Sequence, residues 1–416
     1  MIFLNKWKKD LKPVFVSVGA GIHQLKLIQE ARKLGFLVVG VDANLQAPGM
    51  NSCHLKIQES VTNYEEIYVS LQETLMISNV KCVLSKSYGE AVKTACYLGE
   101  RFNIPLVPFS RIDDFIHKEL MKAVFTANDI PTPAYRIIDT KSLRSLHSSK
   151  FPLVIKPPVG HAKKNVKLIQ DFAGLQNFFS GNISRNSRFL LEEYIEGDEI
   201  IAAGIVHNGT YHLADISDKI TSLPPYFVDI IHISPSKYFH LREKIIEIGQ
   251  MITDAFDISS SPLIMELRIT ADENLYCIEA VPEFGGEYLP DILIPERTGY
   301  NFIHETINAV TGGNFIPPNA KSSRKAIAVR FITGRKGTIS TFKDGSSPRS
   351  TGLIFEKMFK NPGDPVSAPV TNHDRIGVVI TRGKTREDAI DNAEYAIEEK
   401  QIMIQTAAPV PDRSNA

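Results

Sequence analysis

Several classes of protein are excluded by what this sequence lacks. Its four cysteines form no C-x-x-C pair, so neither a zinc knuckle nor a disulfide framework is indicated. Lysine plus arginine equals aspartate plus glutamate at 47 each, so no overall basic charge points to nucleic acid or to an anionic membrane. No apolar run approaches the roughly 18 residues of a membrane span. We therefore expect a cytoplasmic protein that binds neither nucleic acid nor membrane.

The composition is typical of a folded chain. Hydrophobic residues make up 43% of the 416 residues, and the mean hydropathy is −0.09. At about 150 residues per domain this length gives two or three domains, each with enough apolar side chains for a core of its own. The length therefore excludes a single small domain.

The first 110 residues alternate apolar strands with helical patterns. Such alternation predicts a parallel, doubly wound sheet. The predicted strands are Val14 to Val18, Phe36 to Val41 and Val80 to Leu84, and the predicted helices cover 22–34 and 88–101. Gly19 and Gly21 with Asp42 downstream suggest a dinucleotide site, but Gln24 stands where the third glycine of that motif belongs. We favour a tight turn that binds no dinucleotide.

The rest of the chain divides at a proline-rich junction. A helical stretch from 111 to 128 gives way to Pro131 and Pro133, which impose extended backbone. Beyond the junction we predict a hairpin of two apolar strands with a polar turn between them, followed by a final unit of strands and one helix. The hairpin strands are Leu263 to Ile269 and Leu275 to Val281; the final unit holds strands at 326–332, 353–358 and 376–381 and a helix at 386–400.

The hairpin carries two glutamates in apolar surroundings. Glu266 and Glu279 stand on its two strands, 13 positions apart. Two carboxylates on one side of a largely buried hairpin repel each other and are costly to desolvate unless a cation compensates. Paired oxygen ligands suit Mg²⁺ held together with substrate phosphates. From these residues alone, two solvated glutamates on an exposed strand face remain an equal alternative.

Two lysines and an acidic segment add to this pattern. Lys118 lies in the helix before the junction, and Lys156 ends an apolar strand, 151–156, next to a flexible segment. A lysine there can act as a point charge on phosphate oxygens, although a single lysine is more often an ordinary surface residue. The segment 159–166, with Lys163, could cover a triphosphate as a lid or could simply be solvated. The segment 190–199 places a strand before an acidic turn that could meet an adenine edge and a ribose.

Taken in order, these residues resemble the ATP-grasp superfamily over nearly the whole chain. The resemblance is to its biotin-carboxylase-like branch, which includes the L-amino acid ligases and carnosine synthase. It implies an α/β and α+β architecture in three parts: an N-terminal doubly wound domain at 1–110, an ATP-grasp domain at 111–320 with a lid lobe at about 134–195, and a C-terminal domain at 321–416.

The resemblance also implies a role for each matching residue. The cofactors would be ATP and Mg²⁺, with Mn²⁺ as a substitute. The implied contacts are Lys118 and Lys156 to phosphates, Glu192, Glu193, Tyr194 and Ile195 to adenine, Glu199 to ribose, Glu266 and Glu279 to magnesium, and Lys163 from the lid.

The sequence departs from the family at the reaction centre. The family reads I-E-x-N-P-R at the second metal strand, whereas this chain has Val281 for the asparagine and Glu283 for the arginine, with Gly285 and Gly286 retained. The charge at that position is therefore reversed. Three readings stay open: Glu283 replaces the missing oxygen ligand, it recognises a cationic amine, or catalysis has been lost. We place Arg268 and Arg330 with the two glycines in the substrate pocket.

The resemblance implies an ATP-dependent ligase. It would join a small carboxylic acid, an amino acid in our interpretation, to an amine through an acyl phosphate and release ADP and phosphate. Two alternatives stay open: a nucleotide-binding interaction protein without turnover, and a bicarbonate-using carboxylase component. The partners expected are the carboxylate and amine substrates; the resemblance leaves a homodimer open, since dimers are common in that family.

Overall fold

The computed structural model describes residues 12–75, 79–86, 89–139, 146, 150–160, 162–180, 187–319, 325–343 and 352–406. These residues form two compact units, and the chain passes between them several times. The first unit holds residues 12–133, 200–216 and 238–319; the second holds the described residues of 134–199, 217–237 and 325–406. The three domain boundaries expected from the sequence stay predictions.

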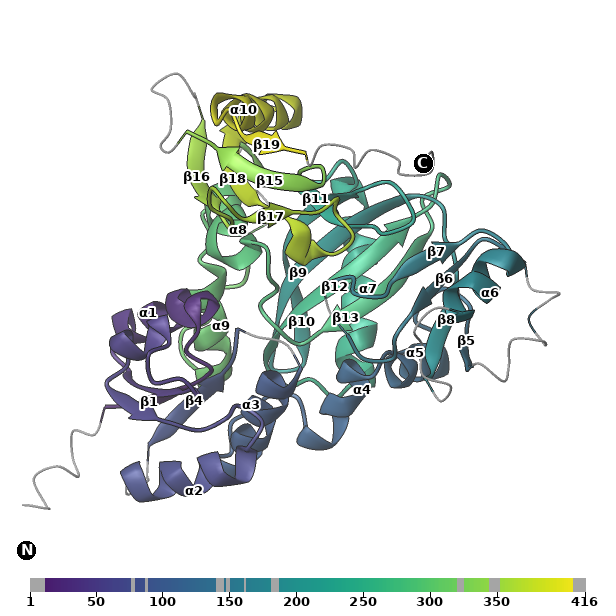
Figure 1. Cartoon of the computed structure of the whole chain (residues 1–416). Helices are drawn as coiled ribbons and strands as arrows, with labels where there is room; N and C mark the ends of the chain where they lie inside the picture. Colours follow the sequence, from purple (N-terminus) through teal and green to yellow (C-terminus); the bar gives the residue numbers. More distant parts are fainter. Residues whose placement is uncertain are drawn as a thin grey trace, which may run out of the picture. The chain divides into compact units, whose positions relative to one another are not determined.

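The first unit begins with the predicted parallel sheet. Strands β1, β2 and β4 coincide with the predicted apolar runs to within one residue, and a fourth short strand, β3, joins them in the order β3-β2-β1-β4. Figure 1 shows β1 and β4 beside α1, α2 and α3, in purple and blue. The elements are β1 (Val14–Val18), α1 (Leu25–Lys33), β2 (Leu37–Val41), β3 (Leu55–Ile57), α2 (Tyr64–Leu75), β4 (Val80–Leu84) and α3 (Glu90–Arg101).

The glycine turn after β1 is closed by its own neighbours. The Asp42 carboxylate accepts a 2.9 Å hydrogen bond from the Ala20 N–H, and the Ala20 carbonyl accepts a 2.7 Å bond from the Gly49 N–H. Asp42, the residue that would bind ribose in a dinucleotide site, is thus hydrogen-bonded to the backbone of the turn itself.

The remainder of the first unit carries the predicted hairpin. In this unit the strand order is β13-β12-β9-β10, and the hairpin of β12 and β13 is confirmed. The elements are α4 (Ile112–Ile116), α5 (Lys118–Ala127), β9 (Asp198–His207), β10 (Thr210–Thr221), α7 (Arg242–Ala255), β12 (Ser261–Ile269), β13 (Leu275–Val281), α8 (Ile294–Thr298) and α9 (Phe302–Thr311). The first residues of β9 and the last of β10 belong to the second unit.

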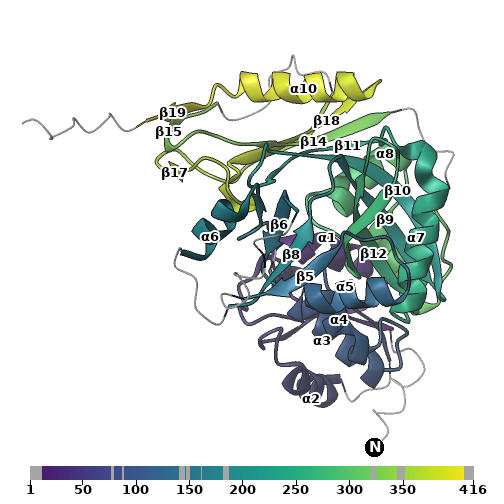
Figure 2. The same cartoon turned by 90° about the vertical axis from the view of Figure 1, so that its right-hand side faces the viewer.

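The second unit contains three groups of strands. An antiparallel sheet has the order β5-β8-β6-β7 and packs against α6; a second runs β10-β11-β14-β18-β16; a small one runs β17-β15-β19. Figure 2 shows α10 lying along β14 and β18. The elements are β5 (Tyr135–Ile138), β6 (Leu153–Lys156), β7 (Lys167–Ile169), α6 (Phe172–Ser180), β8 (Phe189–Glu193), β11 (Asp229–Ser234), β14 (Ala326–Ile332), β15 (Gly337–Thr341), β16 (Leu353–Met358), β17 (Pro365–Val366), β18 (Gly377–Gly383), α10 (Arg386–Glu399) and β19 (Met403–Gln405). Among the described residues no helix is long and apolar enough to cross a membrane.

Tyr211 of β10 packs between two glycines of the first unit. A Cβ on Gly204 of β9 would lie 2.3 Å from Tyr211 Cε2, and one on Gly249 of α7 would lie 2.3 Å from Tyr211 Cδ1. Both glycines therefore leave room for a ring that is itself buried. This contact sets how closely α7 approaches the sheet.

We expect Gly204→Ala to lower the free energy of unfolding by about 1–3 kcal/mol, because the added methyl group overlaps the Tyr211 ring in a packed core. Chemical denaturation measures the change. Gly21→Ala is the control, since its Cβ meets nothing within 4 Å. Equal stabilities for Gly204→Ala and the wild type would contradict this packing.

Candidate active site

The two predicted metal ligands face each other across the hairpin. Glu266 of β12 and Glu279 of β13 are directly paired in the antiparallel register, and both are half-buried. The turn between the strands closes where Glu273 takes left-handed backbone, with φ of 58°, and its N–H bonds to the Thr270 carbonyl at 2.9 Å. Directly opposed residues place their side chains on the same face, so the two carboxylates are neighbours.

A lysine from α5 compensates part of this negative charge. Lys118 Nζ lies 2.8 Å from Glu279 Oε1; the Lys118 side chain is 11% exposed and that of Glu279 is 29% exposed. The sequence predicted one helix over 111–128, but the structure breaks it at His117, whose backbone is extended, so that Lys118 begins α5. The break places the cation at the start of a helix beside the hairpin.

A second lysine fixes α5 against the same strand. Lys122, one turn after Lys118, donates to Thr132 Oγ1 at 2.6 Å and to the Cys277 carbonyl at 3.3 Å, and its side chain is fully buried. Cys277 precedes Glu279 by two residues. The anchoring of α5 to β13 therefore holds Lys118 within reach of Glu279.

Glu283, the residue that reverses the family's charge, stands in a negative environment. Burial raises its pKa from the ordinary 4.5 to about 7, and repulsion from Glu279 and Glu266 adds to the rise, while Lys86 and Lys118 oppose it. A carboxyl group with this pKa holds its proton over part of the neutral range. The charge of Glu283 near neutral pH therefore depends on what binds beside it.

Lys86 and its partner Asp291 were not singled out from the sequence. Lys86 follows β4, and its Nζ lies 2.7 Å from Asp291 Oδ2 on the short helix η6 (Leu289–Leu293). The Lys86 side chain is 3% exposed. One signal could have found it, because sites in parallel sheets lie beyond the carboxyl ends of the strands.

The other residues expected near the hairpin belong to the same unit. Val281 pairs with Ile264 on β12, so an apolar side chain stands where the family has asparagine. Arg268 is buried and two residues from Glu266 on the same strand face. Gly285 has φ of +75° and packs against Ile264, and Gly286 is exposed. Their substrate contacts stay predictions.

In the second unit Lys156 and Glu192 form a buried ion pair. Lys156 Nζ lies 2.6 Å from Glu192 Oε2, and both side chains are almost fully enclosed. The pair arises because β6 and β8 are antiparallel neighbours, with Val154 opposite Glu192. A buried ion pair of this kind holds both charges in fixed positions.

The residues after Glu192 continue along the same edge. Glu193 is exposed, Ile195 is buried, and the Tyr194 N–H donates to the Pro152 carbonyl at 3.4 Å. The Tyr194 ring stacks on Phe227, with centroids 6.2 Å apart and planes at 26°. Their contacts with adenine stay predictions.

Glu199 is held by a lysine that the sequence reading did not single out. Lys219 Nζ of β10 lies 3.5 Å from Glu199 Oε2 and 3.3 Å from Asp229 Oδ1 of β11. Lys219 and Asp229 fall in the stretch 217–235. The available signal was Asp229 directly before the apolar residues Ile230 and Ile231 of β11.

Two further predicted residues lie elsewhere in the second unit. Lys163 has left-handed backbone, with φ of 61°, in the loop between β6 and β7, and His161 of that loop lies outside the described residues. Arg330 Nε of β14 lies 2.6 Å from Glu394 Oε1 on α10. Arg330 is therefore engaged by the helix that covers its sheet.

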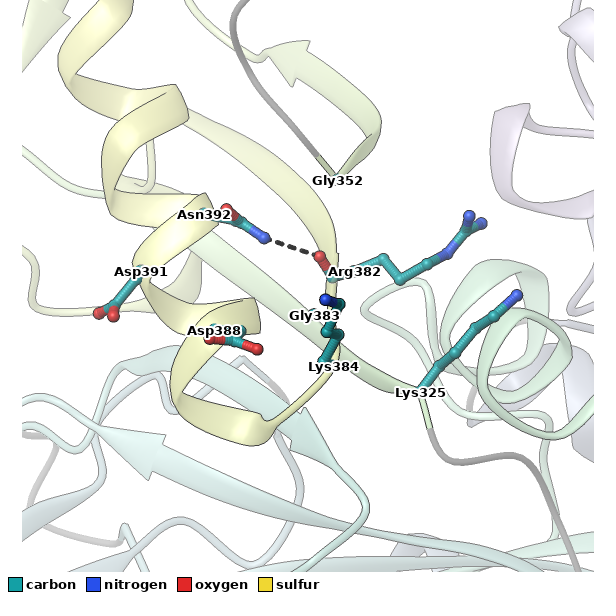
Figure 3. A pocket seen from close by; sticks show the side chains of 8 residues that line it. All are labelled: Lys325, Gly352, Arg382, Gly383, Lys384, Asp388, Asp391 and Asn392. Atoms are coloured by element: carbon teal, nitrogen blue, oxygen red, sulfur yellow. Dashed lines mark hydrogen bonds between the residues drawn. The ribbon is translucent and has the colours of Figure 1, made fainter.

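A surface pocket of the second unit lies where α10 begins. In Figure 3 the Lys325 and Arg382 side chains extend to the same side, while Asn392 donates to the Arg382 carbonyl at 2.8 Å. Its acidic members include Asp388, which caps the start of α10. The lining residues are Lys325, Gly352, Arg382, Gly383, Lys384, Asp388, Asp391 and Asn392, none of them a predicted site residue.

The sequence matches two known domain families. Residues 149–291 match the ATP-grasp domain, and residues 330–405 match the L-amino acid ligase C-terminal domain 2. The first range contains Lys156, Glu192, Glu266, Glu279 and Glu283. The chain therefore contains an ATP-grasp domain followed by an L-amino acid ligase C-terminal domain. The predicted ATP-grasp architecture and the predicted enzyme class, an ATP-dependent ligase, are confirmed.

Individual relatives and solved structures are similar to this chain at low identity. An uncharacterised protein, y4rH, of Sinorhizobium fredii is 24% identical over 366 residues, which are 83% of this chain and 72% of that protein. The L-amino acid ligase of Bacillus licheniformis superposes with a TM-score of 0.76 at 19% identity, over 96% of this chain and all of that one. The biotin carboxylase domain of Hydrogenobacter thermophilus 2-oxoglutarate carboxylase, crystallised with MgADP and bicarbonate, gives 0.70 at 16% identity, over 95% and 91%.

ATP-grasp ligases use ATP with Mg²⁺, and the hairpin fits that ion. Among the described residues, no three His, Cys, Asp or Glu side chains lie close enough together to hold a metal ion by themselves. Mg²⁺ in nucleotide sites needs only one or two protein carboxylates, since phosphates and water supply the other oxygens. The directly opposed Glu266 and Glu279 meet that requirement.

We expect Glu283→Gln to change how stability depends on pH in the metal-free protein. The raised pKa means that the folded state binds this proton more tightly than the unfolded chain, so the wild type loses stability as pH rises from about 4.5 to above 7. Glutamine stays neutral. The variant should therefore gain about 3 kcal/mol relative to the wild type between pH 4.5 and pH 8.

Urea denaturation in EDTA at several pH values measures this difference. Glu247→Gln on the exposed side of α7 is the control. A stability difference between Glu283→Gln and the wild type that stays constant with pH would contradict the environment described for Glu283.

Proposed function

We propose that this enzyme joins a small carboxylic acid, an amino acid, to an amine through an acyl phosphate. The observation that carries the proposal is the directly opposed pair Glu266 and Glu279 with Lys118 on one of them. Two acids and a lysine in partly buried surroundings suit the polyphosphate end of ATP with its magnesium. The match to the L-amino acid ligase C-terminal domain supports an amino acid as the acid.

The chemistry explains why such charges are required. A carboxylate is a poor electrophile because its negative charge repels an incoming amine. When its oxygen attacks the γ-phosphorus of ATP, the bond to the β-phosphate oxygen breaks, and ADP and an acyl phosphate form. The amine nitrogen then attacks the acyl carbon, phosphate leaves, and the nitrogen loses a proton. The first step brings two anions together, so catalysis depends on neutralising and aligning them.

In this proposal the charged residues share that work. Lys118 and Lys156 neutralise phosphate oxygens. Glu266 and Glu279 would hold Mg²⁺, or Mn²⁺ in its place, and the ion would supply positive charge against the phosphates. Lys163, on the loop after β6, adds a cation from the lid that keeps water from the acyl phosphate.

The nucleoside would be held by residues of the second unit. We assign adenine to the segment from Glu192 through Glu193 and Tyr194 to Ile195, and ribose to Glu199. An extended segment offers backbone N–H and C=O groups to the adenine edge, and a carboxylate accepts bonds from ribose hydroxyl groups. The Glu199 side chain is nearly buried, which strengthens such bonds.

Glu283 lies in the part of the site that, in this proposal, binds the amine substrate. The family's arginine would favour an anion there, whereas a carboxylate favours a cation. We propose that Glu283 either adds an oxygen ligand beside Glu266 and Glu279 or binds a cationic amine substrate. Arg268, Gly285 and Gly286 would face the acid, and Arg330 is a further candidate for the substrate pocket. A cytoplasmic location and a homodimer are part of the same proposal, the former because the four cysteines are free.

We expect ADP to form when the protein is given ATP, Mg²⁺ and a suitable pair from a panel of amino acids. Coupled-enzyme detection of ADP with mass spectrometry of the product tests this. Pairs with lysine, arginine or a diamine as the amine should rank high if Glu283 binds a cation. Binding of ATP without turnover for every pair would contradict the ligase proposal.

We expect Glu279→Gln to reduce turnover by at least about 100-fold, because it removes a ligand from the ion that stabilises charge on the phosphates. The control is Asp272→Asn, which removes a carboxylate from the exposed turn of the same hairpin. A turnover rate in Glu279→Gln equal to that of the control would remove Glu279 from the mechanism.

A second function is favoured by one observation. Val281 and Glu283 replace an oxygen ligand and a cation, which fits a nucleotide-binding protein without turnover. Calorimetry separates the two functions: nucleotide binding that is indifferent to Mg²⁺ favours the second, and binding that requires Mg²⁺ favours the ligase.

A further inference from the structure

A buried lysine of the second unit is held between two carboxylates. The Lys219 side chain is 1% exposed and lies between Glu199 and Asp229, which are 11% and 7% exposed. A buried ammonium group is costly unless it is well paired, and removal of one partner leaves the others uncompensated. The position of Glu199 therefore depends on where Asp229 holds Lys219.

Asp229 is in turn fixed by one asparagine of the C-terminal domain. Asn372 Nδ2 donates to Asp229 Oδ2 at 2.6 Å, and the Asp229 N–H donates to Asn372 Oδ1 at 3.1 Å. The two bonds use both ends of the amide. The first bond engages Asp229 Oδ2, whereas Asp229 Oδ1 makes the 3.3 Å contact with Lys219 Nζ described above.

The turn that carries Asn372 is itself firmly held. Thr371 and Asp374 form a capping box around η7 (Asn372–Asp374), and Ser367 donates to Asp374 at 2.7 Å. Arg375 donates from Nε to the Asn372 carbonyl at 2.8 Å and lies 3.8 Å from the centre of the Phe331 ring. The amide of Asn372 therefore has little freedom to move away from Asp229.

The same turn reaches the lid loop. The Asn372 N–H donates to the Ala162 carbonyl at 3.2 Å. Ala162, Lys163 and Asn165 all have left-handed backbone, with φ between 54° and 61°. Residues other than glycine adopt this conformation at a cost and keep it where neighbours hold them. Asn372 thus contacts both the network around Glu199 and the loop that carries Lys163.

We propose that Asn372 is a positioning residue of the nucleotide site: through Asp229 and Lys219 it fixes Glu199 for the ribose, and through its backbone it holds the lid loop. The inference rests on the proposed function, which assigns Glu199 to ribose. It adds that the C-terminal domain sets how strongly the site prefers ribose to a sugar that lacks the 2′ and 3′ hydroxyl groups. Asn372 and Asp229 lie 143 positions apart, in the two different matched domains.

The test compares ATP with 2′,3′-dideoxy-ATP, which lacks the hydroxyl groups that Glu199 would accept. Calorimetry gives the dissociation constant of each nucleotide for the wild type, Asn372→Ala and Asn361→Ala. We expect the wild type to prefer ATP by about tenfold and Asn372→Ala by about twofold or less, since a charge-assisted hydrogen bond is lost when Glu199 is free to move. Asn361→Ala, an exposed asparagine of the same domain, should keep the wild-type preference.

Each outcome bears on a different statement. Weaker binding of both nucleotides with the preference unchanged would make Asn372 merely structural and overturn the inference. A wild type that binds both nucleotides equally would overturn the ribose assignment, and the inference with it. If Asn372→Ala does not fold, Asp229→Asn is measured in its place, since it keeps the side-chain shape and removes the charge that holds Lys219. A wild-type preference in Asp229→Asn would overturn the inference.

Discussion

The opposition of two negative charges on one hairpin is the constraint on which the rest of the first unit depends. Glu266 and Glu279 are directly paired, which is unfavourable for like charges on neighbouring strands. Lys118 offsets part of that repulsion, and Lys122 holds the helix that carries Lys118. The arrangement costs stability in the free protein, because the repulsion is only partly offset.

Two lysines of the second unit are buried beside carboxylates. Lys156 is paired with Glu192, and Lys219 is shared by Glu199 and Asp229. Each buried ammonium group is thereby held in place by its carboxylate partners. The first unit uses the same device, since Lys118 is paired with Glu279 and Lys86 with Asp291.

Val281 and Glu283 replace the asparagine and the arginine of the resembled family, and this changes which substrate group the proposed site would favour there. An oxygen ligand becomes an apolar side chain and a cation becomes an acid, so the local field on an incoming group is reversed. The raised pKa of Glu283 follows from its burial and from the carboxylates nearby. A cation bound in this region, whether a metal ion or an amine, would stabilise the ionised form.

Features local in the chain could be read from the sequence. The parallel strands, the hairpin and the facing glutamates follow from apolar runs, a polar turn and a spacing of 13 residues. The helix break at His117 and the pairs Lys86 with Asp291 and Asp229 with Asn372 could not be read in this way. Their members lie 205 and 143 positions apart, and no periodicity links residues at such distances. Local patterning determined which residues carry charge and on which element. Only tertiary packing decided their partners, because a buried ion is stable only beside a group that the fold brings to it.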